Sequence, residues 1–162
     1  MNKTWLIVEK IIGTALTGWG MVVLYNVTTT VLDMITSGFS HSVKITYLQL
    51  FERNHLNLLL SLATVFAGIM LWFNDKKGWL LSIICAALYC VTFLKSSRAN
   101  SIDSTQPLFE FHKSYALMAL LCLIIFILLI QKPFWKKYQP TKRNWLWVIV
   151  ITAVLLIDKF VF

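Results

Sequence analysis

The residues best suited to chemistry in this chain are histidines and carboxylates that flank long apolar stretches. Glu52 and His55 lie three residues apart where one stretch begins, and Glu110 and His112 precede another. Imidazole and carboxylate groups together ligate zinc or iron, or act as acid and base. No known ligand spacing such as H-E-x-x-H is present, which favours ordinary polar residues at the ends of apolar segments. We therefore expect no bound metal, with a site built on these four residues as the alternative.

Other signatures of catalysis are missing from the sequence. Cys85, Cys90 and Cys122 lie inside apolar stretches and form no C-x-x-C pair, which excludes a thiol relay between paired cysteines. The six glycines are scattered, so there is no phosphate loop, nucleophile elbow or dinucleotide fingerprint. We expect a protein that is not an enzyme and that needs no cofactor.

Five apolar segments are the predicted helices that position the histidines, carboxylates and cysteines named above. The chain has 162 residues, of which 58% are hydrophobic and 14% charged, and its mean hydropathy is +0.71. This composition does not fit a soluble surface, and about 20 apolar residues cross a bilayer as a helix. We predict an all-α fold, a polytopic integral membrane helix bundle of four to five transmembrane helices in a single domain, residues 1–162. The expected spans are residues 11–32, 56–73, 78–94, 114–130 and 145–162.

The segments between the spans refine this organisation. Only residues 74–77 separate the second and third spans, which predicts a tight antiparallel hairpin. Pro133 follows the fourth span closely and blocks continuation of its helix. The last segment has only 13 uncharged residues before Asp158, so a re-entrant or interfacial placement is the alternative to a fifth span.

The 15 lysines and arginines predict the orientation, because cytoplasmic loops carry an excess of them. With the N-terminus inside, nine fall on the inner side and six on the outer side, the outer six being Lys44, Arg53, Lys95, Arg98, Lys113 and Lys159. We therefore expect a membrane protein whose N-terminal end lies on the cytoplasmic side. Its N-terminus and residues 74–77 and 131–144 are expected in the cytoplasm, and residues 33–55 and 95–113 outside.

Polar residues gather at the end of the first span. Asn26, Thr29, Thr30 and Asp33 recur at spacings of three and four, which places them on one face of a helix. One hypothesis is that they line a pore, since polar groups within a membrane are costly and often mark pathways. The alternative is that the helix leaves the bilayer there, with its threonines bonded to backbone carbonyls.

Gly13, Thr17 and Gly18 place small side chains along one side of the first span. Helices in lipid associate where small residues allow their backbones to approach closely. We expect a homo-oligomer that forms through these three residues. The alternative is that they pack within one bundle.

The segment 132–143 combines five cations with three aromatic residues and two prolines. One hypothesis is that this stiff, basic and aromatic segment docks an acidic cytosolic protein. The alternative is an interfacial anchor, with the aromatic rings at the lipid headgroups and the cations on anionic membrane lipid. The candidate docking residues are Lys132, Trp135, Lys136, Lys137, Tyr138, Lys142 and Arg143.

In format the chain resembles the small multi-span membrane subunit of two-gene bacterial anti-phage systems of the Kiwa type. The resemblance rests on the size, the number of spans and the 131–144 segment, and it covers the whole chain. It implies a membrane protein that works with a cytosolic DNA-binding partner in antiviral defence. That family has four spans, so residues 145–162 depart from its pattern, and no functional residues are carried over.

Three classes of function are consistent with the sequence. The first is a non-enzymatic membrane subunit that self-associates and docks a cytosolic partner, in anti-phage defence or in the sensing of membrane stress. The second is a small homo-oligomeric ion channel or transporter, and the third is a metal-binding enzyme that works on the outer face. Direct binding of nucleic acid is not expected, because the charges lie between apolar blocks and form no stripe.

Overall fold

The computed structural model of the chain describes residues 3–36, 47–99 and 110–161, and the statements below concern these residues. They form α-helices joined by short connections and contain no strand, so the all-helical prediction is confirmed. The helices are α1 (Lys3–Thr36), α2 (Tyr47–Trp72), α3 (Lys76–Ala99), α4 (Glu110–Ile130), α5 (Lys132–Tyr138) and α6 (Lys142–Val161).

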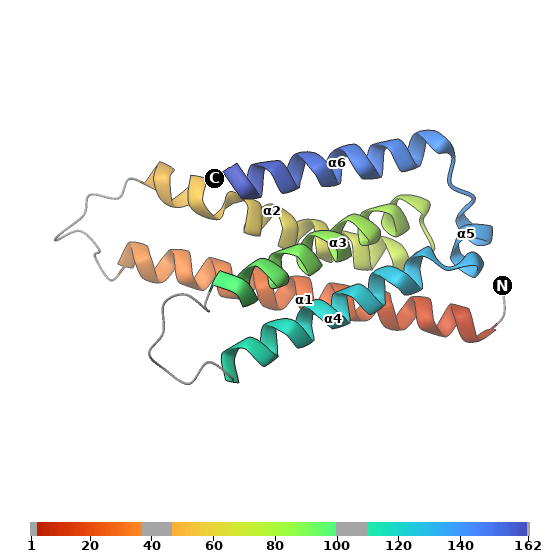
Figure 1. Cartoon of the computed structure of the whole chain (residues 1–162), viewed down its shortest axis with the longest axis horizontal. Coiled ribbons are helices and arrows are strands. Elements are labelled where there is room, and N and C mark those ends of the chain that lie inside the picture. The colour runs from red at the N-terminus through yellow and green to blue at the C-terminus, as the bar shows by residue number, and fades with distance from the viewer. Residues whose placement is uncertain (1–2, 37–46, 100–109, 162) are drawn as a thin grey trace.

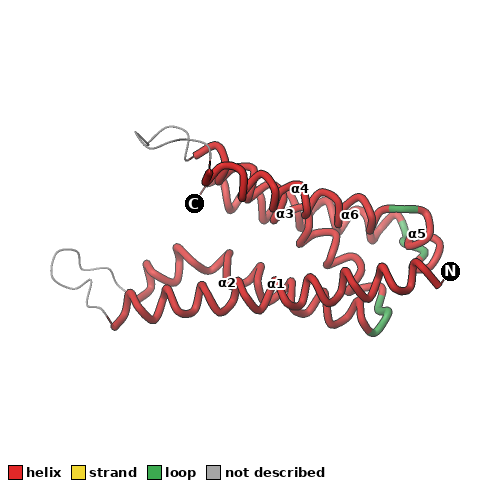
Figure 2. Tube along the Cα trace, turned by 90° about the horizontal axis from the view of Figure 1, so that it is seen from below, coloured by secondary structure: helices red, strands yellow, loops and turns green. Residues whose placement is uncertain are grey.

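The five longer helices run along the long axis of the molecule (Figure 1). α1 packs along α2 and α3 packs along α4, with further contacts between α2 and α3 and between α3 and α6. Figure 2 shows α1 and α2 as one layer and α4 and α6, with most of α3, as another. The layers approach each other at the end that carries the N-terminus and α5, and they diverge toward the opposite end.

Three helices are long and apolar enough to cross a membrane: Lys3–Asp33 in α1, Asn54–Trp72 in α2 and Lys76–Ser96 in α3. α4 and α5 meet the same criterion only as a pair, Ser114–Ile130 with Lys132–Tyr138, and the chain bends by 54° between them. The described residues therefore contain three candidate spans, or four if the bent pair is one span. α6 is helical, but it is not among these candidates, so the count falls below the five that the apolar segments predict.

The helices extend beyond the charge-free runs from which the sequence predicts them. α1 begins at Lys3 rather than at residue 11, so Glu9 and Lys10 lie within it. α2 begins nine residues before its predicted span, at Tyr47, and α3 continues to Ala99. A charged side chain ends an apolar run but not a helix, because the helix is held by backbone hydrogen bonds.

The connections after α2 and α4 have the predicted forms. Asn74 has a positive φ of 59°, and the backbone N–H of Asp75 donates to the Met70 carbonyl oxygen at 3.0 Å, so α2 and α3 form a tight hairpin. α4 ends before Gln131, which is extended, and Pro133 lies in the first turn of α5. Proline is tolerated there because the first amides of a helix have no partner within it.

Small residues bring α1 and α2 of the same chain into close contact. A Cβ added to Gly68 would lie 2.5 Å from the Gly13 carbonyl oxygen and 2.7 Å from the Thr17 nitrogen. α2 therefore covers Gly13 and Thr17, as the alternative of packing within one bundle expects. Gly18 faces away, since nothing lies within 4 Å of a Cβ added there. Of the three residues predicted to join two copies, Gly18 is the one that a second copy can reach.

Candidate functional site

Three parts of the chain meet at the end of the bundle that carries the N-terminus (Figure 1). They are the second turn of α1, the connection between α2 and α3, and α5 with the connection to α6. Residues 131–144, which the sequence predicts as a loop, contain the helix α5 and the start of α6. Polar groups from these parts contact one another, and we call them the Glu9 cluster: Glu9, Asn74, Lys76, Lys137, Tyr138 and Gln139.

Glu9 lies at the centre of this cluster and is completely buried, with 0% of its surface exposed. Lys137 Nζ donates to its Oε2 at 2.5 Å, and the Tyr138 hydroxyl donates to its Oε1. Burial, and then the adjacent Glu9 carboxylate, raise the pKa of the Tyr138 hydroxyl, so the hydroxyl keeps its proton and remains a donor. A buried carboxylate is costly unless it is paired and hydrogen-bonded. Two consecutive residues of α5 meet both requirements and hold α5 against α1.

The inner side of α5 is aromatic. Phe134 and Tyr138, one helical turn apart, are both buried. Phe134 meets the Trp5 ring of α1 edge to face, with centroids 5.7 Å apart, and Tyr138 stacks on Trp79 of α3 with centroids 5.3 Å apart. Trp79 is fixed in turn, because its Nε1 donates to the Leu129 carbonyl oxygen near the end of α4 at 2.9 Å. α5 therefore packs on α1, α3 and α4 together.

The α2–α3 and α5–α6 connections are tied to each other in both directions. Lys137 Nζ donates to Asn74 Oδ1 at 2.6 Å, and Lys76 Nζ donates to the Gln139 carbonyl oxygen at 2.9 Å. Asn74 and Gln139 both adopt left-handed backbone conformations, with φ of 59° and 42°. Such residues commonly end a helix and turn the chain. Each lysine thus bonds to the residue at which the other connection turns.

The outer side of α5 and the start of α6 carry the other predicted docking residues. Their members are exposed, and we call them the basic–aromatic surface: Lys132, Trp135, Lys136, Lys142 and Arg143. Trp135 is 43% exposed and stacks on Trp145 with centroids 5.1 Å apart. Lys137 and Tyr138 belong instead to the Glu9 cluster. Side chains project from a helix in different directions, and these two lie on the side of α5 that faces the bundle. Whether these two residues also contact a partner stays a prediction.

Sequence reasoning missed Glu9 and Asn74 as members of a site. One signal was available, because Glu9 and Asp75 are the only acidic residues in the segments that the sequence predicts to be cytoplasmic. An acid within an apolar helix needs a partner, and the basic segment 132–143 holds five cations. The positions of these cations in the sequence do not predict which of them pairs with Glu9.

The polar run at the end of α1 bonds largely to its own backbone. The hydroxyls of Thr28, Thr29 and Thr30 donate to carbonyl oxygens one turn earlier at 2.7, 3.0 and 2.7 Å. This is the arrangement expected of a helix that leaves the bilayer. Asn26 and Asp33 are exposed, and a pore lined by this face stays a prediction.

The predicted metal-binding residues are described only in part. His55 Nε2 lies 3.2 Å from Asp158 Oδ2, a pair that joins α2 to the end of α6 and that the sequence did not predict. The side chains of Glu52, Glu110 and His112 lie outside the described residues. Within the part of the chain that the structure describes, no three His, Cys, Asp or Glu side chains could hold a metal ion. The alternative of a metal site that includes the other three residues is therefore not tested by the described residues.

Comparison of the chain with protein-family models, with curated proteins and with solved structures finds no match. The function is therefore argued from the geometry of the chain itself.

Proposed function

We propose that this chain is a non-enzymatic, multi-span subunit of the bacterial inner membrane that docks an acidic cytosolic protein on the basic–aromatic surface. In this proposal α1 to α4 cross the membrane and α6 crosses as a fifth span. The N-terminus, the α2–α3 connection and α5 lie in the cytoplasm. The nine-to-six excess of cations on this side supports the orientation.

Apolar side chains on the outer faces of the helices support a lipid environment. α4 exposes Leu117, Leu120, Leu121, Leu123, Ile124 and Ile127, and α6 exposes Leu146, Trp147, Ile149, Val150, Ile151, Val154 and Ile157. In water, contiguous apolar surface of this extent drives association. In a bilayer it faces lipid tails that are equally apolar.

The observation that carries the docking proposal is the division of α5 into a fixed inner side and an exposed outer side. Glu9 and Trp79 hold Lys137 and Tyr138, so α5 is anchored to the bundle without a partner. Trp135 is thereby presented among cations in a defined geometry, which reduces the entropy lost on binding. Exposed aromatic and cationic groups are frequent energetic centres of interfaces, and the positive charge selects an acidic partner.

Lipid anchoring uses the same side chains, so the experiment must separate it from docking. Trp135→Ala combined with Lys136→Gln removes the ring and one cation and leaves the Glu9 cluster intact. Docking predicts a loss of affinity of roughly 30-fold, since truncation of a central aromatic costs about 2 kcal/mol. The measurement is a titration of the subunit, in nanodiscs of zwitterionic lipid, with the cytosolic protein that co-purifies with the wild-type chain after mild detergent extraction. Lys77→Gln, which removes another exposed cation at this end, is the matched control and should bind normally.

Equal affinity of the double variant and the wild type would refute docking. If the double variant loses both partner affinity and membrane insertion, the surface is assigned to lipid anchoring instead. The resemblance to Kiwa-type subunits extends the proposal to anti-phage defence, in which the partner is a cytosolic DNA-binding protein. In that case the double variant should also fail to protect cells from phage.

A further inference from the structure

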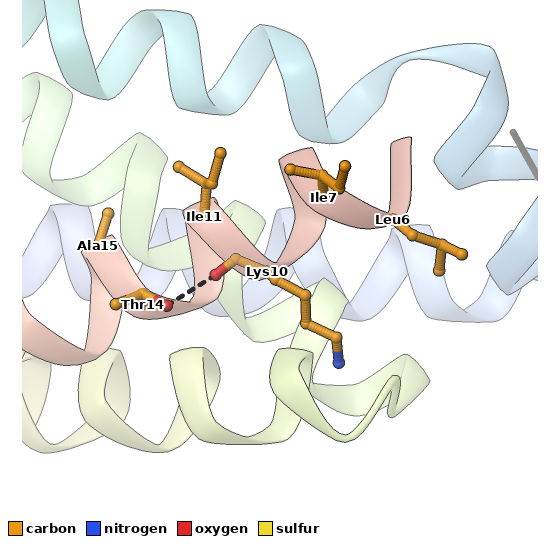
Figure 3. A pocket seen from close by; sticks show the side chains of 6 residues that line it. All are labelled: Leu6, Ile7, Lys10, Ile11, Thr14 and Ala15. Atoms are coloured by element: carbon orange, nitrogen blue, oxygen red, sulfur yellow. Dashed lines mark hydrogen bonds between the residues drawn. The ribbon is translucent and has the colours of Figure 1, made fainter. Parts of the chain in front are cut away.

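An open groove follows one side of α1 near its N-terminal end (Figure 3). It has a volume of about 590 Å³ and is lined by Leu6, Ile7, Lys10, Ile11, Thr14 and Ala15. Ile7 and Ile11 are 60% and 61% exposed, so the rest of the described chain leaves them uncovered. The groove therefore offers an apolar surface to a ligand.

One edge of the groove carries a fixed cation. The Lys10 ammonium donates to the Trp72 carbonyl oxygen at the end of α2 and lies 4.9 Å from the centre of the Trp72 ring. Thr14 supports this arrangement, because its Oγ1 accepts from Trp72 Nε1 at 3.0 Å and donates to the Lys10 carbonyl oxygen at 2.9 Å. An ammonium group has three donors, and the bond to Trp72 uses one.

The apolar and charged groups are arranged along the helix in a definite order. Ile7, Ile11 and Ala15 are four residues apart and form one row, about 12 Å long at 1.5 Å per residue. In Figure 3 Ile7, Ile11 and Ala15 point to one side of α1, and the Lys10 side chain points away from that side, toward the end of α2 to which it bonds. The cation thus flanks the N-terminal part of the row, and the row continues past it along the helix.

The charge around the groove selects a negative ligand. Lys3 is exposed at this end of the bundle, while the Glu9 carboxylate is buried beneath Lys137 and Tyr138. A second copy of this chain would bring a formal net charge of +8, which does not complement Lys10. The lining calls for a molecule with one anionic group and a long apolar part.

We propose that the groove holds an anionic glycerophospholipid, with its phosphate at Lys10 and an acyl chain along Ile7, Ile11 and Ala15. The inference rests on the proposed function, since it needs α1 in the membrane with its N-terminus at the inner surface. It adds a specific lipid-binding site at the end of the bundle that also presents the basic–aromatic surface.

The test reconstitutes the full chain in nanodiscs of equal phosphatidylglycerol and phosphatidylcholine, releases it into detergent and counts retained lipids by native mass spectrometry. Wild type should retain phosphatidylglycerol preferentially. Lys10→Gln should lower that preference about fivefold, the effect of one lysine near an anionic headgroup. Ala15→Trp, at an exposed position that fills the groove, should reduce retention of both lipids. Lys77→Gln is the matched control and should keep the wild-type ratio.

The outcomes separate this inference from the proposed function. An unchanged lipid ratio in Lys10→Gln would overturn the phosphate site. Unchanged lipid retention in Ala15→Trp would overturn the acyl-chain site in the groove. The second variant tests the groove even if Lys10→Gln fails to fold. Efficient disulfide formation between copies carrying Ile11→Cys would place a second copy there and also refute the lipid. Recovery of the chain outside the membrane fraction would refute the proposed function, whereas membrane insertion without lipid preference would refute the inference alone.

Discussion

Glu9→Gln tests whether the buried carboxylate holds α5 in place. Glutamine keeps the size of the side chain and one carbonyl acceptor, but it leaves the Lys137 ammonium without its counter-ion. Loss of one partner from a buried ion pair costs about 3–5 kcal/mol. The Lys137 side chain is 20% exposed and keeps its bond to Asn74, so we expect the lower end, about 3 kcal/mol.

The cost should appear as local opening of α5, because the contact of α1 with α2 at Gly13 and Thr17 is untouched. Hydrogen exchange in detergent micelles, followed by mass spectrometry, measures such opening. The amides of Trp135 and Gln139, which donate to carbonyls within this segment, should exchange on the order of 100-fold faster than in wild type. Amides in the buried centre of α3, residues 82–86, should exchange at their original rates.

Asp75→Asn is the matched control for Glu9→Gln. It makes the same change from acid to amide at the same end of the bundle, but Asp75 accepts a bond from the Lys77 backbone N–H that asparagine can keep. Adding Lys137→Met to Glu9→Gln should recover part of the loss, because no lone charge then stays buried. If the amide exchange rates of α5 in Glu9→Gln stay within about twofold of wild type, which is the scatter expected of unrelated sites, then Glu9 does not hold α5 in place.

Two further predictions concern orientation and self-association. Single cysteines at Ser40, Ser104 and Thr141, in a background without the native three, should react with an impermeant thiol reagent on intact cells at the first two positions only. The reverse pattern would invert the proposed orientation. Gly18→Leu should keep the fold and shift the detergent-solubilised particle to a smaller mass, and an unchanged mass would remove α1 from the contact between copies. Gly68→Leu makes the same substitution at a glycine in close contact with α1, and the overpacking, worth about 1–3 kcal/mol or more, should lower the unfolding temperature. Equal stability of Gly18→Leu and Gly68→Leu would contradict the close contact of α1 and α2.

The positions of the helices are predictable from where charge and proline interrupt apolar sequence. Residues 74–77 leave room only for a tight hairpin between two apolar helices, in which Lys76 and Lys77 already belong to α3, and Pro133 cannot continue α4. The starts and ends are less predictable. Glu9 and Lys10 lie inside α1, and their partners, Lys137 and Trp72, come from distant parts of the chain.

The Glu9 cluster is harder to predict for the same reason. Composition groups Trp135 with Tyr138, and both look like residues of one aromatic and basic segment. The structure separates them, because Tyr138 finds the Trp79 ring and the Glu9 carboxylate, whereas Trp135 stays on the outer side. The side of a seven-residue helix that faces the bundle depends on which side chains of the other helices can contact it. The local sequence does not contain that information.

A ribosome completes Glu9 long before Lys137, because 128 residues separate the two. At about 5–20 residues per second, the delay is roughly 6 to 25 s. Throughout it the carboxylate has neither the cation nor the hydroxyl of α5, so water must solvate it and the first turns of α1 remain at the aqueous surface. α1 can pack on α2 as soon as both have been made, but Glu9 gains its partners only when most of the protein has been made. A copy that ends before α5 therefore lacks both the cation and the hydroxyl that cover Glu9 in the finished protein.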